Sequence, residues 1–388
     1  MAGSYAELGD IRAVYDGALT SDIQVRTFRH TDRLFPVRVV ATGSKVRPLE
    51  PALRRLPAID FQAAGIRYDL VDFLALNRVT GILVLKDGRV ACEEYALGNT
   101  PETRWMSMSI AKTITATLVG AAIHDGHIGT LDDVVTEYVR ELRGSAYESV
   151  TVRQLLQMSS GVGWDETYTN PASDRRRMLE AQISLRPGAI LSLMAQLPRV
   201  AAPGARWNYS TGETFIAGAL VSAAVRRTLS DYMSERIWVP LGMEAPATWW
   251  LESPDGLEIG GSGLAATLRD YGRFAQFLLD DGKIGAERIL PQGWLAEAAA
   301  PQLINGERID YGYMVWPLAA APGAVNEGAF QAIGIFGQHL YVNPRERVAI
   351  VIWGAQPKPN GKAPVLAADF FAAVTAALRQ GSADGQIQ

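Results

Sequence analysis

SIAKTITATLVGAAIH, residues 109–124, begins with a serine and a lysine three positions apart, Ser109 and Lys112. Its apolar residues recur three and four positions apart and Gly126 follows as a stop signal, so the stretch predicts one long, largely buried helix. A spacing of three residues places both side chains on one helix face, about 5–6 Å apart between their Cβ atoms. The stretch therefore brings a hydroxyl and an amine together at a helix N-terminus.

A serine hydroxyl beside a lysine amine has a chemical use. The hydroxyl is a poor nucleophile until a base takes its proton, and a lysine can be that base when burial and nearby charge lower its pKa. Backbone N–H groups at the helix N-terminus would stabilise a developing oxyanion. Taken alone the S-x-x-K motif is weak, because a surface serine that caps a helix can have a lysine three residues later by chance.

Two later segments could complete such a site. Tyr209 is followed by small polar residues at the mouth of a predicted helix and could act as a second proton relay, although a core tyrosine near a turn has the same pattern. Residues 332–338, AIGIFGQ, predict a strand in which a glycine such as Gly334 lets the backbone approach a substrate and add a second oxyanion N–H. Each glycine could equally relieve packing within a sheet.

Strand patterns occur near both ends of the chain, and helical patterns occur between them. Residues 82–85 and 90–95 predict a hairpin around Asp87-Gly88. Further strands are predicted at residues 311–316, 332–336, 339–342 and 348–353, before a final amphipathic helix near residues 365–378. The pattern between about 130 and 300 is mostly helical.

This distribution predicts an α/β (α+β) architecture, with an antiparallel sheet flanked by helices and a mostly helical domain inserted into it. We expect the sheet domain to consist of residues 61–125 and 300–388, and the inserted domain of residues 126–299. Residues 1–60 contain four prolines and little periodicity, so they are expected to form an extended N-terminal arm. The catalytic cleft would lie between the two domains.

Composition and charge exclude several classes of partner. With 388 residues, 48% hydrophobic and 20% charged, the chain has the composition of a packed globular protein. A net charge of -4 argues against a broad basic face, so nucleic acid is not an expected partner. The basic run of residues 175–177 is more typical of a solvated helix face than of a site for an acidic substrate.

The single cysteine, Cys92, excludes an intrachain disulfide. The first ten residues have no basic segment followed by an apolar one, and the longest apolar runs fall short of the roughly 20 residues that span a bilayer. We therefore expect a cytoplasmic protein that does not associate with membranes. A homodimer is possible.

Other catalytic chemistries have less support in the sequence. No G-x-S-x-G motif occurs, so a Ser-His-Asp triad on an α/β-hydrolase fold is not supported. His124 and His127 lack the H-E-x-x-H spacing of a zinc helix, and His339 is interpreted as an ordinary strand histidine. The sequence contains no phosphate loop and no dinucleotide fingerprint. We expect no metal and no cofactor.

Taken together and in this order, the S-x-x-K helix, the Tyr-Ser motif and the glycine strand resemble the β-lactamase-like serine hydrolases. The 6-aminohexanoate-dimer hydrolases and family VIII carboxylesterases are the most similar groups. The resemblance covers roughly residues 60 to 380. It rests on MSIAK (108–112), QMSSG (157–161) through YTNPAS (168–173), YSTG (209–212) and GQHLYVNP (337–344).

The resemblance implies roles for particular residues. Ser109 would be the nucleophile, with Lys112 and Tyr209 as paired bases. The backbone N–H groups of Ser109 and Ile335 would form the oxyanion hole. Tyr168 matches a tyrosine that closes over the substrate in the nylon-oligomer enzymes. Trp164, Gly334 and Phe336 are further candidates for substrate contact, although tryptophans are more often core residues.

Two departures narrow the expected substrate. Where β-lactamases and peptidoglycan peptidases carry Lys-Thr-Gly, this chain has Ala332-Ile333-Gly334, so the groups that hold a substrate carboxylate are missing. Asp174 is a candidate for the acidic residue that would hold a substrate amino group. We expect hydrolysis of a small-molecule carboxylic ester or linear amide through an acyl-enzyme on Ser109. The alternatives are a β-lactamase or D-Ala-D-Ala peptidase, an acyltransferase, and a catalytically silent ligand-binding protein of the same fold.

Overall fold

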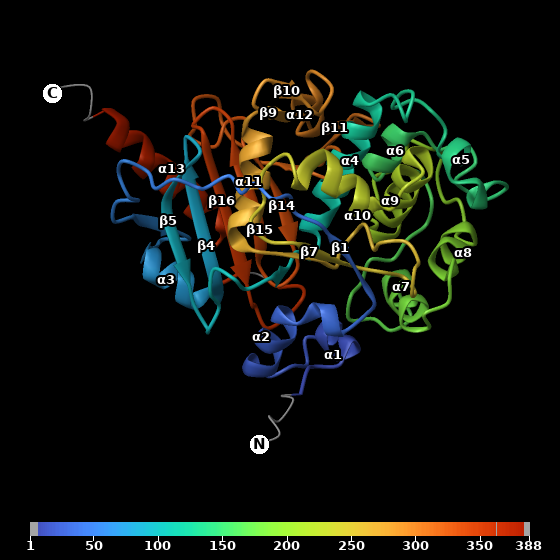
Figure 1. Cartoon of the computed structure of the whole chain (residues 1–388), viewed down its shortest axis with the longest axis horizontal. Helices are drawn as coiled ribbons and strands as arrows, with labels where there is room; N and C mark the ends of the chain where they lie inside the picture. The colour runs from blue at the N-terminus through green and yellow to red at the C-terminus, as the bar shows by residue number, and fades with distance from the viewer. Residues whose placement is uncertain (1–6, 362, 384–388) are drawn as a thin grey trace.

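The main sheet combines strands from both ends of the chain, in a computed structural model that describes residues 7–361 and 363–383. Its six antiparallel strands lie in the order β13-β14-β15-β16-β4-β5 (Figure 1). The predicted hairpin is present, and its turn residues Asp87 and Gly88 both have positive φ, as a tight two-residue turn requires. The strands are β4 (Val79–Lys86), β5 (Arg89–Tyr95), β13 (Trp316–Pro317), β14 (Phe330–Gly334), β15 (Gln338–Asn343) and β16 (Val348–Gly354).

Helices cover both faces of this sheet. Alternate residues of β16 pack on different sides: Ile350 belongs to one apolar cluster with α3 (Leu70–Leu76) and α13 (Ala367–Ala383). Val351 belongs to a larger cluster with α11 (Leu268–Leu279) and α4 (Ile110–His124). Because neither face meets water, β4 and β16 are buried and apolar along almost their whole length, without the alternation of a half-exposed strand.

The helix predicted after Ser109 is confirmed as α4. It is buried over nearly its full length and packs against α9 (Thr211–Val225), so it joins the sheet half of the molecule to the helical half. Figure 1 shows these helices on the side of the molecule opposite α13 and α3. The other helices of this half are α5 (Val135–Tyr138), α6 (Val152–Leu156), α7 (Asp174–Ile183), α8 (Ala189–Ala195), α10 (Leu229–Met233), and the single turns η2 (Arg140–Leu142) and η3 (Ser234–Trp238).

A second, four-stranded sheet lies beside α10, and two of its strands, β7 (Ala247–Trp250) and β8 (Leu264–Ala266), come from the segment expected to be mostly helical. The order of this sheet is β1-β7-β8-β6, with β1 (Val37–Val40) and β6 (Trp105–Met106). Its strands come from four separate parts of the sequence. The division at residues 126 and 299 stays a proposal. Helix α11 lies within the segment assigned to the inserted domain, but it packs on strands β4, β15 and β16 of the main sheet.

The expected extended arm is wrong for much of residues 1–60. Residues 1–6 lie outside the described part of the chain, but α1 (Ile11–Asp16), α2 (Ser21–Arg29) and the turn η1 (Thr31–Arg33) follow. The Asp10 side chain caps α1 by accepting from two backbone N–H groups, and Gly17 ends it in the left-handed region. These helices are too short for a clear period, and their apolar residues are buried in the main core.

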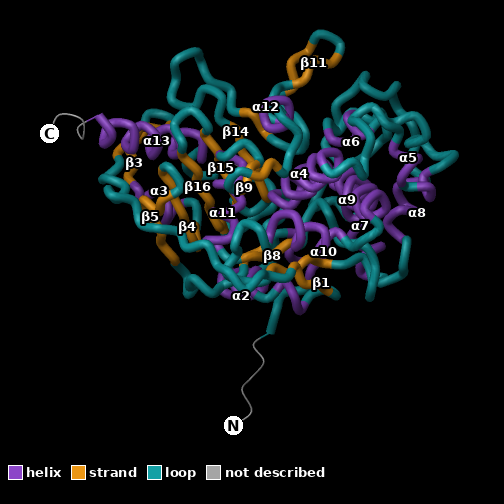
Figure 2. Tube along the Cα trace, turned by 45° about the horizontal axis from the view of Figure 1, so that its top comes forward, coloured by secondary structure: helices purple, strands orange, loops and turns teal. Residues whose placement is uncertain are grey.

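The strand predicted at residues 311–316 is also wrong, because only Trp316 and Pro317 pair with β14. Met314 has a φ of 55°, which breaks an extended run. The preceding segment instead forms β11 (Gln302–Ile304) and β12 (Glu307–Ile309), a hairpin that protrudes in Figure 2. The remaining short elements are β2 (Asp60–Ala63), β3 (Ile66–Asp69), β9 (Lys283–Ile284), β10 (Glu287–Arg288) and α12 (Trp294–Ala298).

Within the described residues, every helix is too short or too polar to cross a lipid bilayer.

Candidate active site

Ser109 and Lys112 lie at the N-terminal end of the buried helix α4. The Nζ of Lys112 is 3.0 Å from the Oγ of Ser109. Lys112 is 1% exposed, so its amine meets protein atoms on nearly every side. Met108, directly before the serine, has a φ of 44°, an uncommon backbone conformation that turns the chain sharply from β6 into the helix.

Two further hydrogen bonds fix the direction of the Lys112 amine. Its Nζ donates to Thr211 Oγ1 at 2.9 Å and to the carbonyl oxygen of Gly261 at 3.0 Å. The carbonyl can only accept, and the Thr211 hydroxyl gives its own proton to Glu166 Oε1 at 2.5 Å, so it must accept from Lys112. A neutral amine has two hydrogens. Both are engaged in this way, and the remaining lone pair points at the Ser109 hydroxyl.

Burial lowers the pKa of Lys112 to about 7. The nearby Glu166 carboxylate acts in the opposite direction, and Arg175 lowers the pKa further. Near neutral pH a substantial fraction of the amine is therefore unprotonated. This is the state in which a lysine can take a proton from a serine.

Tyr209 lies close to both Ser109 and Lys112, one residue before the N-cap of α9. The Lys112 Nζ is 5.2 Å from the centroid of its ring, and the ring stacks on Trp316 with centroids 5.8 Å apart. Burial and the Glu166 carboxylate raise the pKa of the Tyr209 phenol, while its hydrogen bond with Ser109 acts in the opposite direction. The phenol stays protonated at neutral pH and can pass a proton to or from the serine oxygen.

The end of β14 passes directly beside the serine. A Cβ on Gly334 would lie 2.6 Å from the carbonyl oxygen of Ser107 and 2.9 Å from the Cβ of Met108. Only glycine fits this approach, which brings Ile335 to the same cavity as Ser109. The two residues expected to supply the oxyanion N–H groups therefore face one space.

The structure contains a cavity of about 610 Å³ in front of Ser109. Tyr168, Gly334 and Phe336 line it, as the sequence suggested, although the Phe336 ring packs against Phe28 in the core with centroids 5.1 Å apart. Trp164 does not line it and lies behind Glu166, to whose Oε2 its indole N–H donates at 2.5 Å. The lining residues are Ser109, Glu166, Thr167, Tyr168, Tyr209, Trp316, residues 333–337, His339, Gln356, residues 359–361 and Ala363.

Two expectations about charged residues near the cavity are wrong. Asp174 does not reach it, because this residue begins α7, pairs with Arg177 at 2.8 Å and accepts the N–H of Asp165. The basic run is not a solvated face either. Arg175 is 4% exposed with its guanidinium 4.4 Å from the centre of the Tyr15 ring, and Arg176 is 4% exposed and pairs with Asp16.

Sequence reasoning missed three residues that orient Lys112: Glu166, Thr211 and Gly261. Glu166 accepts from both the backbone N–H and the hydroxyl of Thr211 and lines the cavity. A signal for Glu166 existed, since it is an acid two residues before Tyr168. Thr211 lies within the YSTG motif, but nothing in the sequence pairs it with Lys112. Gly261 lies 149 positions from Lys112 and carries no local signal.

Within residues 7–361 and 363–383, no three histidine, cysteine or acidic side chains gather in a way that could hold a metal ion. The chemistry available at this cavity is that of a serine hydroxyl, a lysine amine of lowered pKa, a phenol and backbone N–H groups. Such a set can transfer an acyl group to the serine and on to water. The fold and the cavity thus define a serine acyl-transfer site.

Comparison with known proteins agrees with this class. The β-lactamase family model matches residues 77–373. A 6-aminohexanoate-dimer hydrolase from Paenarthrobacter ureafaciens is 28% identical over 347 residues, 86% of each chain, and a β-lactamase from Yersinia enterocolitica is 22% identical over 72% of this chain and 82% of its own. A solved Bacillus anthracis structure, whose name also refers to 6-aminohexanoate-dimer hydrolase, superposes with a TM-score of 0.81 at 22% identity, covering 98% of this chain and 99% of its own. The chain belongs to the β-lactamase family and is a serine hydrolase.

Proposed function

We propose that this chain hydrolyses small carboxylic esters or linear amides through an acyl-enzyme on Ser109. One observation carries the proposal: an amine whose pKa burial lowers to about 7 lies 3.0 Å from the Ser109 hydroxyl and can direct only its lone pair at it. The similarity to a 6-aminohexanoate-dimer hydrolase over 86% of both chains supports an amide or ester as the substrate.

In the first half of the reaction, Ser109 Oγ attacks the substrate carbonyl carbon as Lys112 Nζ takes the hydroxyl proton. The carbonyl oxygen becomes an oxyanion, which the backbone N–H groups of Ser109 and Ile335 stabilise. The tetrahedral intermediate then loses its alcohol or amine. The proton on Lys112 passes, with Tyr209 as the relay, to that leaving group.

The second half repeats the sequence with water. Water attacks the acyl carbonyl while the neutral amine accepts its proton, and collapse of the intermediate breaks the bond to Ser109 Oγ. The proton returns to this oxygen and the carboxylic acid leaves. Transfer to an alcohol would use the same acyl-enzyme with the alcohol in place of water, so analysis of products in the presence of added methanol separates hydrolase from acyltransferase.

The direct test compares two serines two residues apart. Ser109→Ala should abolish turnover of p-nitrophenyl butyrate and labelling by a fluorophosphonate probe. Ser107→Ala should retain both, because the Ser107 hydroxyl bonds to the neighbouring carbonyl of Met108 and to the Tyr271 side chain, and to neither Lys112 nor Tyr209. Equal loss in both variants would contradict the assignment of the nucleophile, and an unlabelled native protein would favour a silent ligand-binding role.

The cytoplasmic location and the homodimer also stand as proposals. Cell fractionation tests the first. Light scattering on the purified chain tests the second, with a mass of twice 42.1 kDa expected for a dimer.

A further inference from the structure

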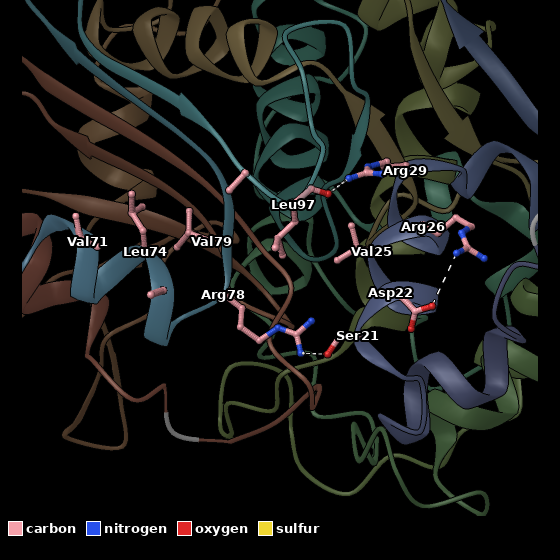
Figure 3. A pocket seen from close by; sticks show the side chains of 12 residues that line it. Ser21, Asp22, Val25, Arg26, Arg29, Val71, Leu74, Arg78, Val79 and Leu97 are labelled. Carbon is pink, nitrogen blue, oxygen red and sulfur yellow. Dashed lines mark hydrogen bonds and ion pairs between the residues drawn. The ribbon is translucent and has the colours of Figure 1, made fainter.

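A second cavity, a groove of about 840 Å³, lies between α2 and α3 at the ends of β4 and β5. The groove and the catalytic cavity lie on different faces of α2. Gln24 and Phe28 contact Gln356 and Phe336, which line the catalytic cavity, whereas Val25 lines the groove. Figure 3 shows its apolar side chains extending from α3 across to α2. They are Val25, Val71, Leu74, Val79 and Leu97.

Two of these apolar side chains are left exposed. Val71 is 69% exposed and Leu97 is 54% exposed. Leu97 also has a φ of 52°, a conformation that leucine adopts at a cost, and the fold does not bury its side chain in return. Covering both side chains with an apolar chain would remove that surface from water.

The groove carries a surplus of positive charge. Its lining includes Arg26, Arg29 and Arg78 but only one acid, Asp22, which pairs with Arg26 at 3.8 Å. Arg78 donates to the Ser21 hydroxyl, and Arg29 donates to Asn99 Oδ1 and to the carbonyl of Leu97. In the described part of the chain neither Arg29 nor Arg78 contacts a carboxylate. Arg78 has five N–H donors and uses one, so it can bind an anion.

We propose that this groove binds one medium-chain fatty carboxylate, with its carboxylate at Arg78 and its alkyl chain over Val71, Leu74 and Leu97. A neutral lipid would leave the two arginines without an anion. A short anion such as acetate would leave the exposed apolar surface in water. The volume falls in the range of about 300–1,000 Å³ typical of small-molecule sites.

Calorimetric titration with monomeric decanoate tests the proposal. It is carried out on Ser109→Ala, so that the outcome does not depend on acyl-enzyme chemistry. We expect one binding site for decanoate. Its affinity should be about tenfold lower in Arg78→Gln and also reduced in Val71→Glu. Both substituted side chains lie at the surface. The matched control is Arg186→Gln, which replaces an exposed arginine in the loop after α7. This variant should bind decanoate with the affinity of the parent. Decanol should bind more weakly than decanoate.

Location is tested by a photoreactive decanoate with the reactive group in its chain. We expect it to label peptides that contain residues 71–79 or 21–29. Labelling confined to residues 333–337 of the catalytic cavity would overturn the proposal, as would equal affinity in parent, Arg78→Gln and Val71→Glu. Two other results would also overturn it: association only with anionic phospholipid vesicles, or a dimer that Val71→Glu converts to monomers.

Discussion

At the level of single residues, the protonation of Lys112 decides when Ser109 can react. The amine must be neutral to accept a proton, and burial lowers its pKa to about 7. The kcat/KM for p-nitrophenyl butyrate should therefore rise with pH through about 7, and fall about tenfold per unit below it. Because Tyr209 exchanges protons with the same serine, the measured value belongs to the coupled pair. A rate that stays flat from about pH 5 to 9, with chemistry limiting, would remove lysine as the base.

Glu166 acts on the same amine from a distance. Its carboxylate raises the pKa of Lys112 and holds the Thr211 hydroxyl in the orientation that accepts from the amine. Glu166→Gln should therefore move the acid limb of the pH profile to lower pH. It should also reduce kcat by about tenfold or more, since a glutamine cannot accept from both Thr211 groups with the strength of a carboxylate.

Asp165→Asn is the matched control for Glu166, because it removes the adjacent carboxylate, which is exposed and accepts from Thr167 and Asn170 but not from Thr211. The acid limb of the pH profile of Asp165→Asn should lie at the same pH as that of the parent. An unshifted limb in Glu166→Gln, with kcat alone reduced, would show that Glu166 supports the loop structurally without tuning Lys112.

The extent to which the sequence predicted the site follows from how far apart the interacting residues lie. Ser109 and Lys112 share one helical turn, so local spacing alone brings them together. Thr211 lies 99 positions from Lys112, and no local pattern indicates that contact. The burial of Arg175 was missed for the same reason, because its partner Tyr15 belongs to a helix of six residues that is too short to show a period.

At the level of elements, strand β14 decides which substrates fit beside Ser109. Ala332 and Ile333 occupy the positions where the β-lactam-processing relatives hold Lys-Thr. A penicillin carboxylate would lose a charge-assisted hydrogen bond there, which contributes about 1.5–3 kcal/mol. The basic run of residues 175–177 does not replace the missing cation. Arg177 pairs with Asp174, while Arg175 and Arg176 are buried against α1.

We therefore expect p-nitrophenyl butyrate to be turned over with a kcat/KM roughly 10- to 150-fold above that of nitrocefin, relative to their intrinsic reactivities with hydroxide. A neutral ester has no carboxylate and loses nothing at β14. The two substrates are measured on the same preparation, with Ser109→Ala as the blank. A higher value for nitrocefin would overturn the substrate class.

At the level of the whole molecule, the N-terminal helices stabilise the wall of the catalytic cavity. The Tyr15 ring stacks on the ring of Tyr168 with centroids 6.2 Å apart and lies over Arg175. Asp16 pairs with Arg176, whose guanidinium also donates to the carbonyl of Tyr168 at 3.1 Å. The sequence pattern predicted an extended arm here and left its role open, yet α1 contacts a residue that lines the catalytic cavity.

This packing predicts that Tyr15→Leu raises the KM for esters several-fold while changing kcat little. Leucine keeps apolar volume in the core but loses the ring stack and the Arg175 contact, at a cost of about 1–3 kcal/mol in stability. Arg12→Ala on the same helix is the control: its ion pair with Glu180 is about half exposed, so its loss should change neither KM nor stability measurably. Tyr15→Phe keeps the ring and should retain the parent KM. If Tyr15→Leu and Arg12→Ala gave the same KM, the stack would have no part in holding Tyr168, and the contact of Arg176 with the Tyr168 carbonyl would be the one that positions this residue.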